Sequence, residues 1–213
     1  MKYCRIFHEK YDTDTDLCEL GLKYGTDKTT LHIYTPFYHS LFSLLRHKPI
    51  VFGEIGIYEN QSMKMWRDYF PNAKLYGWDC EVSDKNDQRE EYSKDFVESA
   101  KMDNLQNTVY DYMDVTNINS IENALKKTET KFDILIDDSD HSFWSQINLI
   151  RTVPSFLNPG GMLIIEDVEN KNYVFRNHIS MYGHQKFYSD FIEVKTGNPN
   201  DNIYIFIRNE VEQ

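Results

Sequence analysis

The chain has 213 residues, 40% hydrophobic and 15% aromatic, so it can bury one substantial core but hardly two. Its formal net charge of −11 argues against duplex DNA or RNA as a partner, because binding to phosphates needs a basic surface that no Lys/Arg cluster supplies. No apolar run approaches the roughly 18 residues that cross a bilayer, and the first residues lack the apolar region of a signal peptide. We therefore expect a cytoplasmic protein with no membrane partner.

The amino-terminal 48 residues precede the expected core, which we place at residues 49–213 of one compact domain. Residues 1–20 are polar and predict a lead-in helix or arm. The segment from Lys23 to Lys28 reads KYGTDK, a glycine- and hydroxyl-rich turn that is either a plain connector or a flap over a ligand. Aromatic and apolar residues at helical spacing follow, up to Leu45.

Alternating strand and helix patterns fill the rest of the chain. Five apolar segments predict buried strands: residues 49–57, 74–79, 108–113, 133–137 and 161–166. Because helical patterns separate these segments, we expect a parallel sheet with helices on both faces. Two alternating apolar runs, at 187–195 and 202–208, flank a turn and predict a terminal antiparallel hairpin. The predicted fold is α/β, Rossmann-like and doubly wound, with a mostly parallel seven-stranded sheet that ends in this hairpin.

The end of the first strand has the form of a nucleoside-binding turn. Glu54 and Gly56 end the strand, and an amphipathic helix follows. The three-glycine dinucleotide fingerprint is absent, since the turn holds Asn60 and Gln61, and this argues against a nicotinamide enzyme. Asp79 ends the second strand and is either a ribose-binding carboxylate or a solvated acid.

Two strands end abruptly in carboxylates. Asp138 follows the 133–137 strand, and Glu166 and Asp167 close the 161–166 strand. Neighbouring strands lie roughly 5 Å apart, so these carboxylates can converge and would repel one another without a cation. All-oxygen ligands indicate Mg²⁺, with Mn²⁺ or Ca²⁺ as alternatives, rather than zinc. The other interpretation is a set of solvated acids, and His141 is then an ordinary loop histidine rather than a base.

Four of these motifs together resemble one family. KYGTDK at 23–28, Glu54-Ile55-Gly56, Asp137-Asp138-x-x-His141 and Glu166-Asp167 resemble class I S-adenosylmethionine-dependent methyltransferases, and within them the metal-dependent sugar O-methyltransferases of macrolide biosynthesis. The resemblance covers nearly the whole chain from about Leu17.

The resemblance assigns a role to each matching position. It implies that S-adenosylmethionine is bound by residues of the flap and the strand ends, namely Thr26, Glu54, Gly56, Ser62, Asp79, Asp114 and Asp137. It implies that Asp138, Glu166 and Asp167 bind a divalent cation and that His141 is the general base. Where relatives tend to have glycines, this chain has Asn60 and Gln61.

The acceptor is open at this stage. A sugar hydroxyl, free or in a nucleotide-linked sugar or glycoside, is the favoured acceptor, because a vicinal diol can chelate the metal. A catechol-like diol would serve the same chemistry, and a non-catalytic nucleoside-binding or scaffold protein is the alternative of another class. Homo-oligomerisation is possible on this sequence. Tyr34, Tyr38, Trp144, Tyr173 and His178 could line an acceptor pocket, but the sequence assigns them no role.

Overall fold

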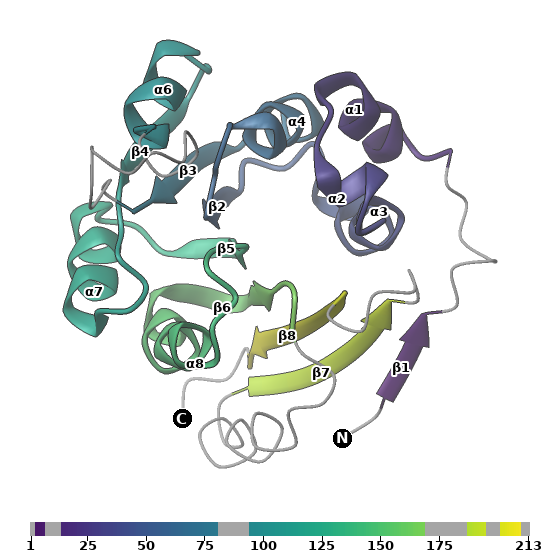
Figure 1. Ribbon diagram of the computed structural model, residues 1–213. Coiled ribbons are helices and arrows are strands. Elements are labelled where there is room, and N and C mark those ends of the chain that lie inside the picture. Colours follow the sequence, from purple (N-terminus) through teal and green to yellow (C-terminus); the bar gives the residue numbers. More distant parts are fainter. Residues whose placement is uncertain (1–2, 7–13, 81–93, 169–186, 195–200, 210–213) are drawn as a thin grey trace.

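The computed structural model describes residues 3–6, 14–80, 94–168, 187–194 and 201–209 (Figure 1). Eight strands of this part form one sheet in the order β1-β7-β8-β6-β5-β2-β3-β4. The strands are β1 (Tyr3–Ile6), β2 (Val51–Ile55), β3 (Lys74–Asp79), β4 (Thr108–Tyr112), β5 (Phe132–Asp137), β6 (Leu157–Ile165), β7 (Phe187–Val194) and β8 (Asn202–Arg208).

Helices cover both faces of the sheet. The α-helices are α1 (Asp16–Tyr24), α2 (Asp27–Thr30), α3 (Thr35–Phe42), α4 (Gln61–Tyr69), α6 (Phe96–Met102), α7 (Ile118–Lys127) and α8 (Phe143–Thr152). Two short 3-10 helices are η2 (Ser43–Leu45) and η3 (Val153–Phe156). Apolar residues of α1, α3, α4 and α6 share one core with one sheet face, and those of α7 and α8 share a second core with the other face. None of the helices described is long and apolar enough to span a membrane.

The topology confirms the predicted fold class. The strands from β2 to β6 pair in parallel, and β7 and β8 form an antiparallel hairpin on β6. Strand β1 adds one strand to the seven predicted, because Tyr3–Ile6 pair in parallel with β7. A four-residue strand within a polar stretch has too little apolar alternation for the sequence to predict it. The 1–48 and 49–213 division stays a prediction.

The segment before β2, residues 14–48, is called the flap after its predicted role, and it has a defined local structure. Thr15 caps α1 by accepting a hydrogen bond from the Cys18 amide. Gly25 ends the helix in the left-handed conformation (φ 72°), and its amide donates to the Gly21 carbonyl. The chain can then turn into the single helical turn of α2. This turn directs the Lys28 side chain into the protein, where it is 1% exposed.

Candidate metal and cofactor site

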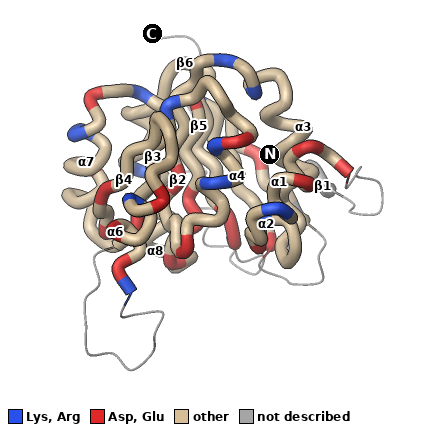
Figure 2. Tube along the Cα trace, turned by 90° about the horizontal axis from the view of Figure 1, so that it is seen from above, with Lys and Arg blue, Asp and Glu red and all other residues tan. Residues whose placement is uncertain are grey.

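Acidic side chains gather where β2, β5 and β6 end. The Asp138 amide donates to the Ile55 carbonyl, and the Glu166 amide donates to the Asp137 carbonyl, so the ends of the three strands are aligned. Figure 2 shows acidic residues along the edge of the molecule that lies between α8 and α2, at the bottom of that view. Parallel strands present their carboxyl ends at one edge, which is where ligands bind in such sheets.

Three of the predicted residues converge at this edge. The Nε2 atom of His141 lies 3.6 Å from Asp167 Oδ2 and 3.9 Å from Asp138 Oδ1. One ligand atom from each of the three lies within 4.8 Å of the others. His141 and Asp167 both have left-handed backbone, with φ of 55° and 51°. Non-glycine residues rarely adopt this conformation, and such strain concentrates at functional sites.

Glu166, the third predicted metal ligand, is turned inward. Its Oε2 accepts from the Lys28 ammonium at 2.5 Å, and its Oε1 accepts from the Tyr38 hydroxyl at 2.5 Å. Glu166 is buried and is not in the group of converging ligand atoms formed by Asp138, His141 and Asp167. Its predicted role as a ligand therefore stays a prediction, to which we return below.

Two tyrosines of the flap reach the carboxylates. The Tyr34 hydroxyl donates to Asp167 Oδ1 at 2.6 Å, as Tyr38 does to Glu166. Burial and then the neighbouring carboxylates raise the pKa of both phenols well above the ordinary value, so both hydroxyls stay protonated and donate. Trp144 is exposed at the start of α8, while Tyr173 and His178 lie outside the described residues.

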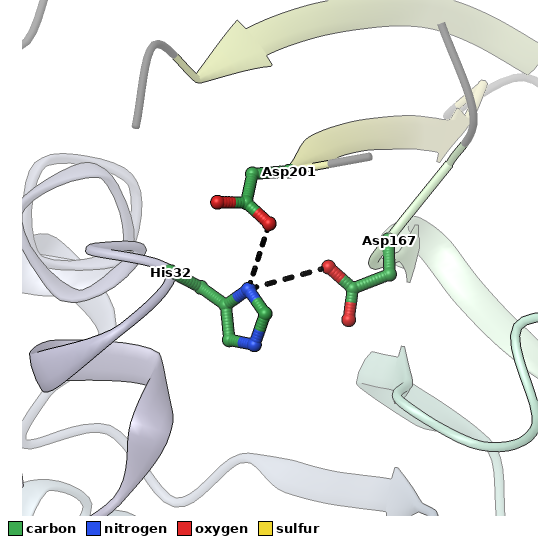
Figure 3. Close-up of side chains that lie close together, drawn as sticks. All are labelled: His32, Asp167 and Asp201. Atoms are coloured by element: carbon green, nitrogen blue, oxygen red, sulfur yellow. Dashed lines mark hydrogen bonds and ion pairs between the residues drawn. The ribbon is translucent and has the colours of Figure 1, made fainter. Parts of the chain in front are cut away.

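His32 lies beside Asp167 and Asp201 (Figure 3). Its Nδ1 is 2.8 Å from Asp201 Oδ1 and 3.6 Å from Asp167 Oδ1. Burial disfavours the charged imidazole, but Asp167 and Asp201 outweigh this effect and raise the pKa of His32. The segment after α2 is thereby joined to the ends of β6 and β8.

The predicted cofactor turn is built on a buried acid. Glu54 Oε2 accepts from the Ser62 hydroxyl at 2.8 Å, and Oε1 lies 3.2 Å from Lys28 Nζ. Gly56 has φ of 90°, and a Cβ there would lie 2.0 Å from the Asp138 carbonyl oxygen. Glycine at 56 is therefore required for the β2 and β5 ends to pack together, which is a structural reason beside the predicted cofactor contact.

Asn60 lies in the turn where the family resemblance predicts a glycine. It has left-handed backbone (φ 68°), which Asn tolerates better than most residues. Its Oδ1 accepts from the Tyr110 hydroxyl at 2.9 Å, and its Nδ2 donates to Asp103 at 2.8 Å. The chain therefore keeps a left-handed turn before α4 without glycine at this position.

The remaining predicted cofactor residues lie at the strand ends and in the flap. Asp79 is half-buried at the end of β3 and accepts from the Tyr58 amide at 2.9 Å and the Cys80 amide at 2.8 Å. Asp114 is exposed beyond β4 and accepts from Thr116. Thr26 is buried at the start of α2.

Asp137 ends β5 and is buried. Its Oδ1 accepts from the Ser139 hydroxyl at 2.6 Å, and burial raises the pKa of Asp137 to about 7. The structure thus places all the predicted residues at one edge of the sheet or in the flap beside it, and their contacts with a cofactor stay predictions.

Sequence reasoning assigned no role to five residues that belong to this site. Lys28 was part of a recognised motif, and the spacing of Tyr34 and Tyr38 by four residues predicts only a shared helix face. Asp201 follows a turn signal in the hairpin, and His32 lies in a short loop. Each has its partner in this site more than 100 residues away in sequence, so a local pattern could not have found them.

Comparison with known proteins shows which enzymes this chain is similar to. No protein-family model matches the chain. Two Streptomyces olivaceus enzymes are 29% and 30% identical over 160 and 161 residues: the 8-demethyl-8-alpha-L-rhamnosyl tetracenomycin-C 2'-O-methyltransferase and the corresponding 2-methoxy-rhamnosyl 3'-O-methyltransferase. The chain is similar to sugar O-methyltransferases. Each alignment covers 72% of this chain but only 38% or 37% of the relative, so the chain spans less than two fifths of their length.

Solved structures identify the fold. A MycE methyltransferase in complex with Mg, SAH and mycinamycin VI superposes with a TM-score of 0.66 at 19% identity, over 92% of this chain and 55% of that one. A putative O-methyltransferase from Klebsiella pneumoniae gives 0.56 at 14% identity and covers 88% of that chain. The fold is that of the class I methyltransferases, as the motifs predicted.

Proposed function

We propose that the chain is a divalent-metal-dependent O-methyltransferase that transfers a methyl group from S-adenosylmethionine to a sugar hydroxyl. The observation that carries the proposal is the convergence of Asp138, His141 and Asp167 at the carboxyl edge of a methyltransferase fold. The relatives support the acceptor class, because their names specify methylation of rhamnosyl hydroxyls.

The residues at this edge fit a hard divalent cation. Asp138 Oδ1 and Asp167 Oδ2 are carboxylate oxygens in partly buried positions, and such oxygens are the ligands that Mg²⁺ and Mn²⁺ prefer. The cofactor residues fit a nucleoside, because the half-buried carboxylate of Asp79 lies beside the left-handed turn at Tyr58, where a ribose diol can donate to it.

The chain's own residues divide the chemistry between them. When bound, the cofactor supplies a methyl group activated by a positive sulfur, and the cation lowers the pKa of a coordinated hydroxyl. Asp138 and Asp167 would hold the cation and with it the acceptor hydroxyl. His141 would take the acceptor proton at Nε2, which would leave the acceptor oxygen free to receive the methyl group from the sulfur. The buried Tyr34 and Tyr38 hold the Asp167 and Glu166 carboxylates by hydrogen bonds.

The acceptor class is tested by methyl transfer. Purified protein is given labelled S-adenosylmethionine and Mg²⁺ with a rhamnoside, or with a catechol, and labelled product is counted with and without a chelator. We expect chelator-sensitive product from the rhamnoside. Product from the catechol alone would support the aromatic acceptor instead, and cofactor binding with no transfer to either acceptor class would favour a nucleoside-binding protein.

A further inference from the structure

Lys28 is a buried lysine enclosed by three carboxylates. Its ammonium lies 2.5 Å from Asp138 Oδ2, 2.5 Å from Glu166 Oε2 and 3.2 Å from Glu54 Oε1. The side chain is 1% exposed, and Glu54 and Glu166 are as deeply buried. The ammonium donates hydrogen bonds to Asp138 and Glu166, and Glu54 Oε1 adds an ion pair without hydrogen-bond geometry.

The Lys28 ammonium offsets the negative charge of the three carboxylates. Buried carboxylates from β2, β5 and β6 would repel one another strongly, and a buried ammonium is stable only when it is paired. The three carboxylates thus provide the counter-charge that a buried ammonium requires.

The carboxylate oxygens around Lys28 and His141 fall into two sets. The inner set comprises Glu54 Oε1, Asp138 Oδ2 and Glu166 Oε2, which surround the ammonium. The outer set comprises Asp138 Oδ1 and Asp167 Oδ2, which face His141. Asp138 belongs to both sets, so the contact with Lys28 fixes the direction of its outer oxygen. The second oxygen of Glu166 is bound by Tyr38.

We propose that Lys28 is a positioning residue, a resident counter-cation that holds the inner carboxylates so that an exchangeable divalent cation binds the outer oxygens. Glu166 is then the counterion of Lys28 rather than a metal ligand. The inference rests on the proposed function, because it assumes that a divalent cation binds at this edge. It explains how the site is ordered before the cation arrives, and it ties the KYGTDK flap to the metal position.

Mn²⁺ affinity distinguishes the roles of Glu166 and Asp167. Binding is measured as the loss of the electron paramagnetic resonance signal of free Mn²⁺. Glu166→Gln keeps the shape of the side chain, and we expect Mn²⁺ affinity within about threefold of wild type, whereas Asp167→Asn lowers it by about tenfold or more. Equal losses in the two variants would overturn the inference. If the wild-type protein bound no Mn²⁺, with or without S-adenosylhomocysteine, the metal dependence in the proposed function would fail and the inference with it.

Thermal unfolding tests the lysine itself. Lys28→Met leaves the inner carboxylates without their counter-cation and no longer fixes the outer oxygen of Asp138, so we expect a lower melting temperature in chelator and a smaller rise on adding Mg²⁺ than in wild type. A purely structural role would lower the melting temperature equally in both conditions, and that result would overturn the proposal. The matched control is Lys64→Met, which removes a partly exposed lysine 2.8 Å from Asp103. If Lys28→Met does not fold, the comparison of the Glu166 and Asp167 variants still decides.

Discussion

The Nε2 atom of His141 lies 3.6 Å from Asp167 Oδ2, across the ends of neighbouring strands. An imidazole in this position can accept a proton from a hydroxyl bound between it and the carboxylates. We predict that His141→Ala lowers the methyl-transfer rate by about 100-fold or more, while the affinity for S-adenosylhomocysteine changes little. His47→Ala, at an exposed histidine before β2, is the control. Turnover at the wild-type rate in His141→Ala would remove the base assignment.

Asp79 is the predicted ribose ligand and also holds the turn through the Tyr58 amide. Asp79→Ala should weaken binding of S-adenosylhomocysteine roughly ten- to hundredfold, because the Asp79 carboxylate is predicted to accept hydrogen bonds from both ribose hydroxyls. Calorimetry measures the change, with Glu122→Gln on α7 as a surface acid that should bind normally. An unchanged affinity in Asp79→Ala would place the ribose elsewhere.

Cys80 offers a footprint of the same site, since it is exposed and follows Asp79 directly. Partial burial of the thiol and the Asp79 charge raise the pKa of Cys80, so less thiolate exists at a given pH than in a free cysteine. In a Cys4→Ser variant, where Cys18 is buried, alkylation should therefore be slow at pH 8 and accelerate above it. Saturating S-adenosylhomocysteine should protect the thiol. Equal labelling with and without the ligand would contradict the site.

Variants of Asn60 test how much the left-handed conformation at this position costs in stability. Asn60→Gly and Asn60→Ala both lose the hydrogen bonds to Tyr110 and Asp103, but only alanine is also strained by the left-handed backbone. Urea unfolding should show Asn60→Ala about 1 kcal/mol less stable than Asn60→Gly. If alanine were as stable as glycine at this position, the conformational account of the turn would be wrong.

The sequence predicted the order of the elements because its strands are short apolar runs with clear ends. Those ends also predicted the edge where Asp138, His141 and Asp167 meet, since parallel strands must present their carboxyl ends together. The same logic explains the seven expected strands, whereas β1 has only four residues and pairs with a strand at the far end of the chain.

The sequence could not show that Glu166 and Asp167 have different partners. Glu166 and Asp167 are adjacent just beyond β6, and the chain turns into a left-handed conformation at Asp167, so that one side chain contacts Lys28 and the other contacts His141. Which of the two faces the cation depends on what the flap places between the strands. Lys28 comes from a helical turn 138 residues before Glu166, so only the folded chain brings them together.

The measurement that tests the account most directly is calorimetric titration of metal-stripped protein with S-adenosylhomocysteine and then Mg²⁺, in wild type and in Asp138→Asn. We predict binding of both ligands to the wild-type protein, with the Mg²⁺ isotherm lost in Asp138→Asn and binding of the nucleoside retained. Failure of the wild-type protein to bind S-adenosylhomocysteine in either the metal-free or the Mg²⁺-loaded form would contradict the methyltransferase assignment.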